Sequence, residues 1–88
     1  MSNIESNSMI IQYLTHNQEY VKKIVEPFTQ QKNYLLEKED ESLKDEINSQ
    51  YKEIIKRMIV EEITKKLAIP AEDVIIIIEN INLEIYLK

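Results

Sequence analysis

The sequence predicts an α+β fold that is mostly helical, with two or three helices followed by a C-terminal two-stranded antiparallel hairpin. Two observations support this prediction. Apolar residues recur every three or four positions along most of the first 67 residues, as they do on one face of a helix. The stretch 74–88 instead holds four consecutive isoleucines, Ile75 to Ile78, and then an alternating pattern. A chain of 88 residues is expected to form one small domain, spanning 1–88.

Three helices are predicted in order along the chain. The first covers about 5–26 and ends or kinks at Pro27, because the proline ring lacks a backbone donor and restricts the preceding residue. The second covers about 29–39 and the third about 42–68. A continuous helix over 29–67 is the alternative, and the acidic run "EKEDES" leads us to favour a break at Asp40–Ser42.

The C-terminal hairpin is predicted over about 74–87. Val74 to Ile78 are all β-branched, which favours a strand, and Leu83 to Leu87 alternate as a return strand would. Residues 80–82 would form the loop. Since the chain contains no glycine, left-handed backbone positions are expected on Asn or Asp, and Asn82 would take the one in this loop.

The predicted hairpin has more apolar surface than its own chain can cover. The third helix can shield one face, which leaves a second face and an unpaired strand edge open to another chain. The predicted interface residues lie on that face and on the third helix: Val74, Ile76, Ile78, Tyr86, Ile55 and Ile59. In the alternative, the first helix wraps the second face and no partner is needed.

The composition indicates no catalytic, cofactor-binding or metal-binding residues. The net charge of −5 argues against a nucleic-acid partner, and the absence of glycine excludes the glycine-rich phosphate-binding loops. The chain has no cysteine, and its one histidine, His16, lies in a polar segment. The acids of 37–41 lack the spacing of a calcium loop. We therefore expect a protein that is not an enzyme and needs no cofactor.

Nothing in the sequence predicts a membrane span or a secretory signal, so a cytoplasmic location is expected. The stretch "YKEIIKRMIVEEITKKLAIPAEDVIIIIENINLEIYLK" resembles, in its hydrophobic pattern, the ring-building motifs of sporulation and secretion assembly proteins. That resemblance implies a role in assembly.

The function predicted from these observations is a small protein-protein interaction module that self-associates through the hairpin and the long helix. A homodimer is our first choice among its possible oligomers. The alternative is an inhibitor or adaptor, of the type that phages and mobile elements encode. Such a protein would bind a host protein by covering a sheet edge or a hydrophobic groove.

Overall fold

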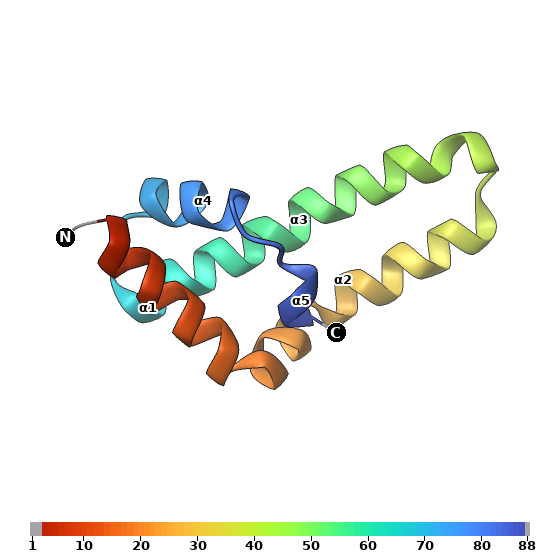
Figure 1. The fold of residues 1–88 in the computed structure, drawn as a ribbon. Helices are drawn as coiled ribbons and strands as arrows, with labels where there is room; N and C mark the ends of the chain where they lie inside the picture. The colour runs from red at the N-terminus through yellow and green to blue at the C-terminus, as the bar shows by residue number, and fades with distance from the viewer. Residues whose placement is uncertain (1–2, 88) are drawn as a thin grey trace.

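The computed structural model describes residues 3–87 and shows five helices within them. These are α1 (Asn3–His16), α2 (Gln18–Lys38), α3 (Glu41–Leu67), α4 (Ala71–Glu79) and α5 (Glu84–Leu87). The long helices α2 and α3 run side by side and project to one end of a particle of 46 × 22 × 19 Å (Figure 1). Helices α1 and α4 lie at the other end. None of the helices in this part of the chain is long and apolar enough to cross a bilayer.

One hydrophobic core lies at the end where α1 and α4 pack against α2 and α3. Helix α3 supplies its centre through Ile59, Val60 and Ile63, three residues on one side of the helix. The other members of this cluster come from α1, α2, α4 and the segment before α4: Ile10, Leu14, Val21, Val25, Ile69, Val74, Ile77 and Ile78. The core is thus a joint product of four helices.

The predicted C-terminal hairpin is wrong, because residues 3–87 contain no strand. The isoleucine run belongs to α4, and the predicted return strand contains the four-residue α5. The likeness to ring-building motifs rested on the same strand assignment and fails with it. A short unbroken run of apolar residues carries no period, so pattern alone does not separate a buried strand from a buried helix.

Local features and packing together explain why 71–79 is helical despite its β-branched residues. Val74, Ile77 and Ile78 follow an i, i+3, i+4 spacing, and all three are buried in the core. Glu72 and Asp73 occupy the first turn, where negative charge interacts favourably with the helix dipole. Tertiary packing of one face therefore outweighs the strand propensity of the run.

The asparagines of the predicted loop end one helix and begin the next. The Asn80 side chain donates a 2.7 Å hydrogen bond to the carbonyl of Ile76, which satisfies an acceptor near the C-terminal end of α4. The Asn82 side chain accepts a 3.1 Å hydrogen bond from the backbone N–H of Glu84, as helix N-caps do. Asparagine is favoured both at helix ends and in hairpin loops, so the asparagines at 80 and 82 do not distinguish a hairpin from two consecutive helices.

Asn82 was also expected to adopt a left-handed conformation, and this expectation is wrong. Within the described residues, the only positive φ belongs to Ala68, with φ 55°, directly after α3. Its backbone N–H bonds the carbonyl of Thr64 and closes the helix end. A left-handed alanine costs about 1 kcal/mol, which a glycine at this position would avoid.

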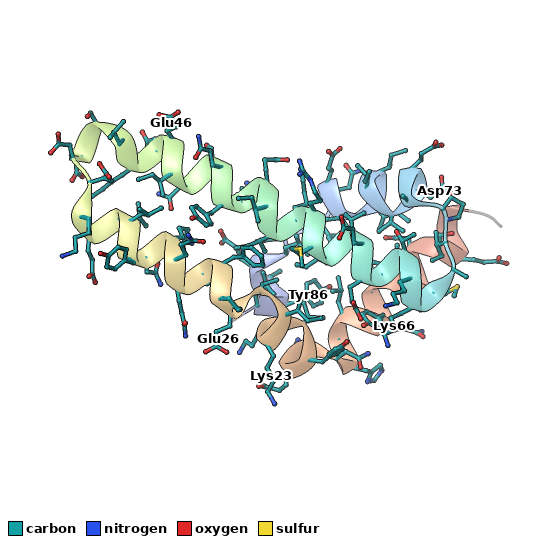
Figure 2. All side chains as sticks on the ribbon, turned by 180° about the vertical axis from the view of Figure 1, so that it is seen from behind. Lys23, Glu26, Glu46, Lys66, Asp73 and Tyr86 are labelled. Carbon is teal, nitrogen blue, oxygen red and sulfur yellow. The ribbon has the colours of Figure 1, made fainter. Side chains whose placement is uncertain are left out.

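The predicted helix end at Pro27 is wrong, because α2 continues through it. A proline at this position leaves the carbonyl of Lys23 without its helical donor. Lys23, Glu26 and Pro27 are all exposed, and Figure 2 shows the first two pointing away from the body of the protein. Water can therefore hydrate the unpaired carbonyl, which makes the proline tolerable on this side of the helix.

The chain instead changes direction at Asn17, inside the predicted first helix 5–26. The backbone of Asn17 leaves the helical conformation, and its side chain donates a 2.8 Å hydrogen bond to the carbonyl of Tyr13. This contact terminates α1. A second interruption separates α2 from α3 at Glu39 and Asp40, where we favoured a break over a continuous helix.

We predict that Ile78→Ala and Ile76→Ala will have very different effects on stability. Ile78 is 2% exposed and lies in the core, so its truncation should lower the free energy of unfolding by about 2–5 kcal/mol. Ile76 is 58% exposed, and its truncation should change that free energy by less than about 0.5 kcal/mol. Urea unfolding followed by circular dichroism measures both. Equal effects would contradict the helix, since a hairpin places both side chains on one face.

Candidate functional site: the helical arm and its groove

The most exposed part of the fold is the outer half of the α2–α3 pair, which we call the arm and define as residues 29–38 of α2 and 41–52 of α3. In Figure 1 the arm extends beyond the other helices. Ile47 and Tyr51 are the buried residues of the arm, and both keep a small exposed fraction, 9% and 8%. Tyr34 and Leu43 are 59% and 39% exposed. Two helices pair here without a third layer to cover them.

Negative charge is concentrated at the tip of the arm. Residues 37–46 hold six acids and two lysines, which accounts for four of the five net negative charges of the chain. One ion pair is formed there, between Glu41 and Lys44 at 2.9 Å, and it lies on the surface where such pairs contribute little. The tip therefore carries a strong negative potential.

A groove runs along the base of the arm, between α2 and α3 on one side and the α4–α5 segment on the other. Its volume is about 840 Å³. The apolar lining residues Ile55, Ile81, Leu83 and Leu87 are half-buried and pack against the core. The polar lining comes mainly from Thr29 and Lys32 of α2, from Asn48, Ser49, Lys52, Glu53 and Lys56 of α3, and from Glu79, Asn82 and Glu84. Ile78 completes the lining.

Lys56 joins the two walls of the groove. Its ammonium lies 3.1 Å from a carboxylate oxygen of Glu53 on α3 and 3.5 Å from one of Glu79 at the end of α4. The hydrogen bond and the charge of Glu53, followed by the charge of Glu79, raise the pKa of Lys56 above its usual 10.5. By contrast, Lys32 and Lys52 form no ion pair within the described residues, so two cations of the groove remain available.

The structure scatters the six predicted interface residues. Val74, Ile78 and Ile59 are buried in the chain's own core. Ile55 and Tyr86 are half-buried and pack against that core, and Ile55 also lines the groove. Only Ile76 lies largely exposed, on the outer side of α4 beside the 41% exposed Ile75. The residues expected on one face thus lie on opposite sides of α4.

Sequence reasoning missed the groove altogether. Lys32 and Lys52 read as ordinary solvent-exposed charges, and nothing local indicates that residues 81–87 fold back beside them. One signal was present. Had 71–79 been treated as a helix, the spacing of Val74, Ile77 and Ile78 would have separated these core positions from Ile75 and Ile76.

A cluster of titratable groups joins α1, α2 and α3 away from the groove. The Tyr20 hydroxyl donates a 3.1 Å hydrogen bond to Glu62, and the Lys66 ammonium lies 5.9 Å from the centre of the Tyr20 ring. The bond to Glu62 raises the pKa of Tyr20 above its usual 10.0. Burial, with the charge of Glu62 second, raises the pKa of Tyr13. Because the hydrogen bond joins α2 to α3, we interpret the cluster as a structural contact between helices.

The other residues considered for chemistry are dispersed. His16 is exposed at the end of α1. Within residues 3–87, no group of three or more histidine, aspartate or glutamate side chains lies close enough together to hold a metal ion. A comparison of the chain with known protein families, with curated proteins and with solved structures found no match.

We predict that Glu62→Gln will lower the pKa of Tyr20 toward 10.0, because the carboxylate that favours the protonated phenol is lost. Ultraviolet titration of the tyrosines measures this shift. In the wild-type protein, the stabilisation from this hydrogen bond should be complete below pH 10 and should be lost as the pH rises through the raised pKa. Glu61→Gln makes the same charge change at the neighbouring exposed position and should leave the titration unchanged. Equal titrations in both variants would contradict the bond.

Proposed function

We propose that this chain is a small non-enzymatic interaction module whose partner is a second copy of itself, bound through the arm and the groove at its base. The observation that carries the proposal is that the arm is only two helices deep. Helix pairs with one unprotected side are stable mainly when another element covers them. Among the described residues, the α4–α5 segment lies beside the base of the arm, and no element covers the outer part.

The groove supports the same proposal. It joins half-buried apolar residues to free lysines, and interfaces between proteins combine an apolar centre with a polar rim in this way. Large exposed side chains on the arm, Tyr34 and Leu43, belong to types that contribute contact area at interfaces. A second copy has both kinds of surface and needs no other molecule.

Further parts of the proposal rest on the sequence. A net charge of −5, with the acids concentrated at the arm tip, supports a protein partner over a nucleic acid. The proposed cytoplasmic location is compatible with the absence of cysteine, since the fold needs no disulfide and hence no oxidising compartment.

The second candidate function is an adaptor or inhibitor that binds a different protein. The outer side of α4 favours it, since Ile75 and Ile76 form an exposed apolar pair on the side of this helix opposite the buried Val74 and Ile78. A protein with this function would be monomeric until its target is present.

We predict that the purified protein has twice the mass of the single chain when size-exclusion chromatography is coupled to light scattering. The range to test is about 1–100 µM, which spans the dissociation constants of ordinary homodimers. Ile76→Lys should leave this mass unchanged, because Ile76 lies on α4 outside the arm and the groove. A monomer throughout the range would contradict self-association and would favour the adaptor function.

A further inference from the structure

The exposed residues of α3 along the arm form a stripe whose charge changes sign from tip to base. Glu41, Asp45, Asn48 and Lys52 are spaced by four, three and four residues, so they lie on one side of the helix. All four are exposed, and Asn48 and Lys52 line the groove. Lys56 continues the stripe into the groove. The stripe is acidic at the tip, neutral in the middle and basic at the base.

The acids and lysines of this stripe are placed symmetrically about its midpoint, with an acid on one side matched by a lysine on the other. The midpoint falls between Asn48 and Ser49. Asp45 and Lys52 lie at equal distances on either side of it, and so do Glu41 and Lys56. If a second α3 lies antiparallel with its own midpoint at the same place, each acid faces a lysine of the partner. A two-fold axis produces this arrangement, and every pair then occurs twice.

We infer that two copies of this chain pack the groove sides of their arms antiparallel about a two-fold axis at Asn48–Ser49. Asp45 of each copy pairs with Lys52 of the other, and the acidic tip of each arm reaches the groove of the other. The inference rests on the proposed self-association and specifies its geometry. A parallel arrangement would bring the two tips together, each with four net negative charges, and is disfavoured by repulsion.

Ion pairs within the chain engage the outer charges of this stripe and leave the inner ones free: Glu41 pairs with Lys44, and Lys56 pairs with Glu53 and Glu79. Asp45 and Lys52 form no ion pair inside the described part of the chain. They lie seven residues apart on α3, about 10 Å along the axis, which is too far for a direct pair. Because both members of the outer pair, Glu41 and Lys56, are already engaged within their own chain, the pair of Asp45 with Lys52 contributes more than the outer pair.

The groove also contains residues that can contact the arm tip of the second copy. Lys32 of α2 lies on the same side as Lys52 and adds a second free cation. Leu36, half-buried near the tip, provides apolar surface for Ile81, Leu83 and Leu87 of the other copy. The groove of each copy thus offers both charged and apolar contacts to the arm tip of the other copy.

A charge-exchange experiment tests the inference. Asp45→Lys and Lys52→Glu, made separately, each place like charges opposite each other twice in the dimer. Each should weaken the dimer about tenfold or more by sedimentation equilibrium. The double variant carries both changes, restores opposite charges across the axis, and should return the dissociation constant to within about threefold of wild type. High salt should weaken the wild-type dimer as well.

Glu46→Lys and Arg57→Glu serve as matched controls, because they make the same charge changes on another side of α3. Figure 2 shows Glu46 pointing away from the arm. The controls should alter dimer affinity by less than about twofold. Circular dichroism should show that each variant is folded. Where a charge-reversal variant fails to fold, the neutral substitution at the same position, Asp45→Asn or Lys52→Gln, takes its place and should also weaken the dimer.

Each alternative outcome is informative. If the wild-type protein is a dimer and neither single variant weakens it, this geometry is overturned and self-association stands. Weakening by both single variants without recovery in the double variant would also overturn the pairing. A wild-type protein that stays monomeric would overturn the geometry together with the proposed function.

Discussion

The burial of one side of α4 is the interaction on which the rest of the structure depends. Val74, Ile77 and Ile78 belong to the same cluster as the core residues of α1 and α3. Burial of each such side chain contributes about 1.5–3 kcal/mol. A nine-residue helix rich in β-branched residues would not be stable alone, so this contact keeps it helical. It also closes one end of the α2–α3 pair and brings residues 81–87 to the base of the arm.

The same packing explains why the protein has two unlike ends. The end with α1 and α4 is covered by helices on several sides, whereas the α4–α5 segment lies only beside the base of the arm, and none of the described elements covers its outer part. The negative charge of the chain gathers at the uncovered end, and the unpaired lysines lie at its base. Separation of opposite charges along one exposed helix face is a pattern that a second, reversed copy complements. The exposure of the arm and its charge distribution therefore both indicate the arm as the surface for self-association.

The sequence was informative where periodicity was clear and local. The stripe from Leu43 to Leu67 predicted a long amphipathic helix, and the acidic run around Asp40 indicated an interruption of the helical chain. It was not informative where the outcome depends on contacts distant in sequence. The isoleucine run has strand propensity but no period, and only packing against α1 and α3 makes it a helix. Pro27 is tolerated because it faces water, which the sequence does not show. Lys32 and Lys52 became candidate site residues only after α5 was placed beside them.

The most direct test of this account is the backbone chemical shifts of residues 74–78, measured by nuclear magnetic resonance. The account predicts Cα shifts displaced toward helical values throughout this run, with strong contacts between successive amide protons. Methyl groups of Val74 and Ile78 should show contacts with Leu14 and Ile63. Extended-type Cα shifts, together with cross-strand contacts between residues 74–78 and 83–87, would contradict it. The α4 packing, the groove and the arm geometry would then have no basis.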